Sequence, residues 1–197
     1  MKILFISLGC DKNLADSEEM LGLLTGNGHE IVDSEEEADA IVINTCCFIH
    51  DAKEESVNTI LEMAEYKKTG TCKILIVTGC MAQRYKEEIT EEIPEVDAVL
   101  GTTSYGDIVK ALNEAEAGHV FQEFKDINAL PEDSGRRVIT TGGHFGYLKI
   151  AEGCDKHCTY CIIPSLRGKF RSVPEERLLK QAEYMASQGV RELILVA

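Results

Sequence analysis

Three closely spaced cysteines lie within the stretch YLKIAEGCDKHCTYCIIP. They are Cys154, Cys158 and Cys161, in the spacing C-x3-C-x2-C. A structural zinc site usually takes four protein ligands, commonly as two close pairs, and no fourth Cys or His follows here at that spacing. The run therefore indicates either a metal with one position left open or cysteines with another role.

Three further cysteines each follow an apolar run. Cys10 comes after ILFISLG, Cys46 after AIVINT and Cys80 after ILIVTG. If the runs are parallel strands of an open α/β sheet, their carboxyl ends share one edge, which is where such sheets bind ligands. Cysteines that merely fill buried strands would be scattered within the strands instead. The pattern therefore predicts a second metal site, assembled from distant parts of the chain.

Thiolate ligands limit the choice of metal. All-sulfur coordination selects zinc, copper(I) or an iron-sulfur cluster, and three thiolates suit a cluster with one iron left without a protein ligand. Zinc stays open if a fourth ligand joins, and His50 is the nearest candidate in sequence. We predict that Cys47 and Cys72 are not ligands. Cys47 should point away from its neighbour Cys46, and Cys72 precedes its strand and should lie at the opposite edge of the sheet.

Short apolar runs alternate with amphipathic stretches from the N-terminus onward, which predicts buried parallel strands joined by helices. We expect strands at residues 2–8, 40–44, 73–78 and 98–101, with a weaker one at 29–32. We expect helices at residues 14–25, 52–68, 83–92 and 108–117. This series predicts an α/β fold built on a doubly wound parallel sheet of the Rossmann-like type.

The periodicity dissolves after HVFQEF into a stretch with Pro, Asp, Ser and Gly. We therefore predict an N-terminal domain over residues 1–125, a linker over 126–142 and the start of a second domain over 143–197. The second domain should hold a strand at 145–151, the cysteine loop, a helix at 174–188 and a strand at 192–197. A complete (β/α) barrel takes about 250 residues, so we expect only the first β-α-β unit of a truncated barrel here.

Composition narrows the function classes. The chain has 197 residues, 44% of them hydrophobic and 27% charged, as in an ordinary globular protein. Its net charge of -14 has the wrong sign for a surface that binds nucleic acid throughout. The N-terminal apolar run is too short for an export signal, and no membrane-spanning segment appears. We expect a cytoplasmic location, where clustered cysteines more often bind metal or do redox work than form disulfides.

The cysteine run, with Tyr160 just before its last cysteine, resembles the signature of the radical S-adenosylmethionine (SAM) enzymes. The segments SLGCDKNLADSE, NTCCFI, TGCMAQR and KIAEGCDKHCTYCIIPSLRGKFRS are together similar to the methylthiotransferases of that group and cover almost the whole chain. SLGC-x-KN resembles the branch that modifies an aspartate of a ribosomal small-subunit protein. Two residues depart from the family pattern: Asp11, where that branch commonly has Pro, and Cys47, where many members have Gly.

The resemblance implies two 4Fe-4S clusters and SAM as cofactors. By resemblance, the auxiliary cluster belongs to Cys10, Cys46 and Cys80, and the radical SAM cluster to Cys154, Cys158 and Cys161. Tyr160 is a weaker candidate for contact with SAM. No catalytic residue beyond the cluster ligands is expected. We expect Arg167 and Lys169 to be solvated or to contact substrate.

The resemblance also implies a transferase activity for the full-length protein. We expect a methylthio group to be added to the β-carbon of an aspartate in a ribosomal small-subunit protein, and this fragment alone to be inactive. Expected partners are that protein and an electron donor such as a flavodoxin or ferredoxin. RNA could be contacted only through missing regions or local patches. Two alternatives stay open: the same chemistry on a modified adenosine in transfer RNA, and a non-catalytic iron-sulfur or redox-sensing module.

Overall fold

A computed structural model describes residues 1–132 and 134–197. The N-terminal part contains a six-stranded sheet in which every paired strand is parallel to its neighbour, in the order β2-β1-β3-β4-β5-β6. The strands are β1 (Lys2–Ser7), β2 (Glu30–Val32), β3 (Ala40–Thr45), β4 (Ile74–Gly79), β5 (Ala98–Leu100) and β6 (Phe121–Glu123). This is the flavodoxin-like version of the doubly wound order, and it confirms the predicted fold class.

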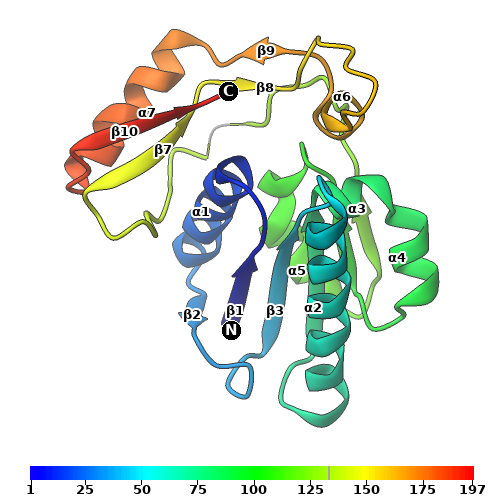
Figure 1. Ribbon diagram of the computed structural model, residues 1–197. Coiled ribbons are helices and arrows are strands. Elements are labelled where there is room, and N and C mark those ends of the chain that lie inside the picture. The colour runs from blue at the N-terminus through cyan, green and yellow to red at the C-terminus, as the bar shows by residue number, and fades with distance from the viewer. Residues whose placement is uncertain (133) are drawn as a thin grey trace.

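Helices cover both faces of this sheet (Figure 1). On one face lie α2 (His50–Thr69), α3 (Cys80–Arg84) and α4 (Lys86–Glu92), and on the other lie α1 (Asp11–Gly26) and α5 (Ile108–Glu116), which follows the short 3-10 helix η1 (Tyr105–Asp107). The helix predicted at 83–92 is therefore two helices. They are separated at Tyr85, whose backbone is not helical.

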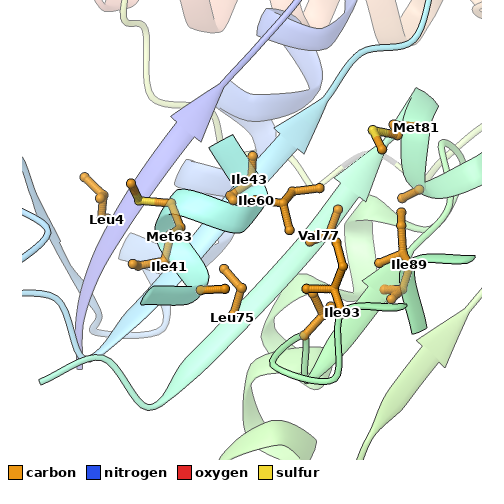
Figure 2. Close-up of a cluster of buried hydrophobic side chains, with 14 of the residues drawn as sticks. Leu4, Ile41, Ile43, Ile60, Met63, Leu75, Val77, Met81, Ile89 and Ile93 are labelled. Carbon is orange, nitrogen blue, oxygen red and sulfur yellow. The ribbon is translucent and has the colours of Figure 1, made fainter. Parts of the chain in front are cut away.

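The central strands carry apolar side chains on both faces because both faces are covered. In β3, Ile41 and Ile43 belong to the core beneath α2, where Figure 2 shows them beside Ile60 and Met63. The intervening residues of β3 belong to the opposite core, beneath α1 and α5. Because side chains alternate between the two faces, the position of a residue at the carboxyl end of a strand decides which helix layer it faces.

The C-terminal part is a smaller unit lying over the carboxyl ends of the first sheet (Figure 1). Its elements are β7 (Phe145–Lys149), β8 (Ala151–Glu152), α6 (Ile163–Arg167), β9 (Arg171–Ser172), α7 (Glu175–Ser187) and β10 (Glu192–Val196). Strand β7 pairs in parallel with β10, and β8 pairs antiparallel with β9. The predicted strand, helix and strand are present, whereas α6, β9 and the earlier β6 were not predicted.

Helix α1 packs against both parts of the molecule. One side of α1 packs on the sheet through Met20 and Leu24. Its other side is covered by the segment before β7, where the backbone N–H of Val138 donates to the Glu18 carbonyl at 3.0 Å. As a result Asp16, Glu18 and Glu19 are all buried. In the described part of the chain, no helix has the length and apolarity needed to cross a membrane.

Candidate metal centres

The first cysteine triad lies at one edge of the sheet, as predicted. Cys10 is the N-cap residue of α1 and lies three residues after the end of β1, Cys46 follows β3, and Cys80 begins α3 after β4. These three strands are neighbours, and the strand order reverses between β1 and β3, which is the ligand-binding point of such sheets. Burial raises the pKa of the Cys80 thiol, and the nearby Cys46 and Cys10 raise it further. Cys46 and Cys80 are each 5% exposed, whereas Cys10 is exposed.

Glycines before two of these cysteines allow the close approach. Gly9 has φ +92°, and a Cβ added there would lie 2.6 Å from Cys46 Cβ and 2.9 Å from its sulfur. Gly79 has φ +94°, and its added Cβ would lie 2.3 Å from Asn44 Oδ1. Both positions need a backbone conformation that glycine adopts without strain. The Gly-Cys pairs therefore let the strand ends turn tightly against one another.

Asn13 joins the three strand ends and was missed as a site residue. Its side-chain amide donates to the Leu8 carbonyl at 3.0 Å and to the Thr45 carbonyl at 2.9 Å, each two or fewer residues before a triad cysteine. Its Oδ1 atom accepts from the Cys80 thiol at 3.7 Å. Asn13 is completely buried. The sequence signal for this role was only a polar residue in the first turn of α1, three positions after Cys10.

The other thiols of this part of the chain behave as packed side chains. The Cys47 thiol donates to the Cys80 carbonyl at 3.3 Å, and burial raises its pKa to about 12. Cys72 lies just before β4, where its thiol donates to the Ile74 carbonyl at 3.3 Å and burial raises its pKa. Both are buried within the hydrophobic core. His50, the candidate fourth ligand of a zinc site, is exposed at the start of α2.

The second triad occupies one loop between β8 and α6. The Cys154 backbone N–H donates to the Gly168 carbonyl at 3.0 Å, and the Cys161 N–H donates to the Cys158 carbonyl at 3.1 Å. Cys158 is exposed, and the other two cysteines are half-buried. Tyr160 is 90% exposed. This loop is thus held mainly by its own backbone and by the turn after α6.

Buried charges from both parts of the molecule meet beside the first triad. Arg167 Nη1 lies 2.9 Å from Asp16 and 3.0 Å from Glu152, and Lys149 contacts the same two carboxylates, with Glu152 at 2.7 Å. Burial opposes ionisation of Glu152, but Lys149 and Arg167 hold its pKa down at about 2. All four side chains are buried.

The expectation that Arg167 is solvated or contacts substrate is therefore wrong: it is 3% exposed. The physical reason is that α1 turns acidic side chains toward the second unit, and a guanidinium buried there gains two carboxylate partners. Lys169, by contrast, is exposed, as expected.

The chemistry of each triad fits a soft metal. Within the described ranges 1–132 and 134–197, no three His, Cys, Asp or Glu side chains are already arranged as a metal site. Each triad nevertheless offers three thiols, a donor set that selects iron-sulfur clusters, copper(I) or zinc. In the first triad, the sheet brings the three cysteines to one edge.

The sequence is similar to curated methylthiotransferases over its full length. It is 64% identical over 197 residues to a protein of Lachnoclostridium phytofermentans named "Ribosomal protein uS12 methylthiotransferase RimO". Proteins of the same name from Clostridioides difficile and Acetivibrio thermocellus are each 50% identical. All of this chain is covered in each case, but only 44% to 45% of each relative. The chain thus spans less than half the length of these relatives.

Family models match both parts of the molecule. Residues 148–197, which include the second triad, match the Radical SAM superfamily. Residues 2–101, which include the whole first triad, match the family described as Uncharacterized protein family UPF0004. The match to UPF0004 covers half of the chain and contains β1 to β5, with the three cysteines of the first triad at the carboxyl edge of these strands. The chain therefore belongs to the UPF0004 family, with a radical SAM segment following its N-terminal sheet.

Proposed function

We propose that the full-length protein containing this chain is a radical SAM methylthiotransferase. It adds a methylthio group to the β-carbon of an aspartate in the ribosomal small-subunit protein uS12. The observation that carries the proposal is a pair of separate cysteine triads, one within each of the two family matches. The name shared by the relatives supports the choice of uS12 as substrate.

Each triad has its own role in this proposal. The loop cysteines, Cys154, Cys158 and Cys161, hold the radical SAM 4Fe-4S cluster. The sheet-edge cysteines, Cys10, Cys46 and Cys80, hold the auxiliary 4Fe-4S cluster. When bound, these clusters and SAM supply the reductive and sulfur-transfer chemistry that side chains cannot. The exposed Tyr160 is free to contact SAM.

The packing of the two parts suits a reaction that uses both sites. Helix α3 begins at Cys80, and α6 begins two residues after Cys161. The two helices pack together, and Thr102 Oγ1 donates to the Leu166 carbonyl of α6 at 2.7 Å. The chain's own contribution is to hold the two triads on the same side of the sheet and to bury most of the first one away from water.

The remaining parts of the proposal concern organisation and partners. The N-terminal domain spans residues 1–125, followed by the connecting segment 126–142 and the start of the radical SAM domain at 143–197. Ribosomal proteins are basic, so the net charge of -14 suits a protein substrate better than RNA. A cytoplasmic flavodoxin or ferredoxin is the proposed electron donor.

Anaerobic reconstitution of the full-length enzyme tests this proposal. Replacing Cys154, Cys158 or Cys161 by Ala should abolish SAM cleavage, because no nearby cysteine can replace a lost ligand. Replacing Cys10, Cys46 or Cys80 by Ala should leave some cleavage but stop methylthiolation of a uS12 peptide, measured by mass spectrometry. Retained cleavage in the first set would contradict the radical SAM assignment. Modification of transfer RNA but not of uS12 would contradict the substrate assignment.

A further inference from the structure

We propose that Arg167 is a positioning residue of the first cysteine site. It supplies a buried positive charge to the Cys80 sulfur and thereby raises the reduction potential of the cluster held there. The proposal rests on the proposed function, because it requires a cluster on the first triad. It also means that the first site is completed by a residue from the second unit.

The geometry around Cys80 singles out Arg167. Nη2 of Arg167 donates to Asn13 Oδ1 at 2.7 Å, and the same oxygen accepts from the Cys80 thiol at 3.7 Å. The guanidinium and the Cys80 sulfur are therefore neighbours that share one acceptor, Asn13 Oδ1. Arg167, Asn13 and Cys80 are all buried, so water screens this contact little.

The orientation of the guanidinium is fixed from its other side. Nη1 pairs with Asp16 of α1 and Glu152 of β8, and Lys149 shares both carboxylates. These two cations and two anions offset the cost of burying each other. Because Nη1 is held by the carboxylates, Nη2 is left on the side of Asn13 and Cys80.

Ligation of a metal increases the importance of this contact. A ligating cysteine is a thiolate, so Cys80 then no longer has an S–H to donate to Asn13. Arg167 still donates to Asn13 Oδ1, and its charge now faces a negative sulfur. Hydrogen bonds to the sulfurs and nearby charge are among the factors that set the potential of iron-sulfur clusters. A fixed cation favours the more negative, reduced form and therefore raises the potential.

The test uses the full-length protein in a C154A/C158A/C161A background, so that the first triad alone holds a cluster. In this background, R167Q removes the charge and R167K keeps it. R137Q is the matched control. Arg137 is also buried at the contact with α1, where it pairs with Glu18 at 2.5 Å, but none of its described contacts involves a cysteine. Each protein is reconstituted anaerobically and titrated reductively, with the reduced cluster followed by electron paramagnetic resonance.

We expect a more negative midpoint potential in R167Q than in the parent and in R137Q, with R167K close to the parent. An unchanged potential in R167Q, or an equal shift in R137Q, would overturn the proposal. If R167Q takes up no iron, R167K decides: a cluster with nearly parental potential supports the role of the charge, and no cluster refutes it. A parent that itself takes up no iron would instead refute the metal site, and with it the proposed function.

Discussion

The two cysteine triads are built in opposite ways. The first is assembled from the ends of β1, β3 and β4, and two of its three cysteines are buried. The second lies in a single loop, with one cysteine exposed and two half-buried. The first site therefore depends on tertiary structure, and the second depends on a short local turn. Changes in folding contacts should consequently damage the first site and spare the second.

Replacing Asn13 should produce the largest difference in iron binding between the two sites. N13A leaves the Leu8 and Thr45 carbonyls without their amide donor and Nη2 of Arg167 without its Asn13 acceptor. Buried groups that lose their partners cost about 1–3 kcal/mol each, so we expect a loss of about 4 kcal/mol in the free energy of unfolding. Iron bound by the first triad should fall to near zero, while iron bound by the second should persist.

The control for this variant is N27A. Asn27 follows the same helix, but its hydrogen bond to the Leu23 carbonyl is exposed. We expect a change of about 0.5 kcal/mol or less. Chemical denaturation and iron analysis of both variants measure the difference, and equal iron loss from both triads in N13A would contradict the contrast.

Closing the gap beside Cys46 should have the next largest effect. In G9A the new Cβ enters a left-handed backbone position and meets Cys46. We expect a destabilisation of about 3 kcal/mol, from backbone strain and overpacking together. Gly28 is a matched control because it has φ +84° with nothing within 4 Å of an added Cβ. G28A should cost about 1 kcal/mol, from strain alone. Thermal denaturation of both variants checks this order; equal costs would mean that Cys46 does not crowd the position.

Thiol reactivity in the metal-free protein should show the contrast without mutation. Cys10 and Cys158 are exposed, whereas Cys46 and Cys80 are each 5% exposed. We expect alkylation of the buried pair to be slower by about tenfold or more, because the buried thiols react only after local opening. Peptide mass spectrometry at a series of times measures each rate. The difference should vanish in denaturant, and a fast Cys80 in the native protein would argue against a preformed first site.

The smallest effect is expected at Tyr160. This side chain is 90% exposed, so Y160A should change the free energy of unfolding by about 0.5 kcal/mol or less. If Tyr160 contacts SAM, the variant should weaken SAM binding in the full-length enzyme. Calorimetric titration with SAM distinguishes this from an unchanged affinity, which would remove Tyr160 from the site.

Sequence periodicity was sufficient to predict the main strands and to place three cysteines at their carboxyl ends. Strand ends are marked locally, by an apolar run followed by Gly-Cys or Thr-Cys. Sequence periodicity was not sufficient to predict the roles of Asn13 and Arg167, whose hydrogen bond joins residues 154 positions apart. Charged positions on α1 such as Asp16 have the pattern of a solvated helix face, and only the packing of the second unit buries them. Short elements such as α6 and β9 have too few residues to show a period.

The iron and acid-labile sulfide bound per chain test the central claim most directly. Three full-length proteins are compared after anaerobic reconstitution: the parent, C10A/C46A/C80A and C154A/C158A/C161A. The account predicts that each triple variant keeps one 4Fe-4S cluster and therefore half of the parental iron. Of the two triple variants, only C10A/C46A/C80A, whose second triad is intact, should change its electron paramagnetic resonance spectrum on addition of SAM. A triple variant that keeps all the parental iron would contradict the existence of two independent cysteine sites.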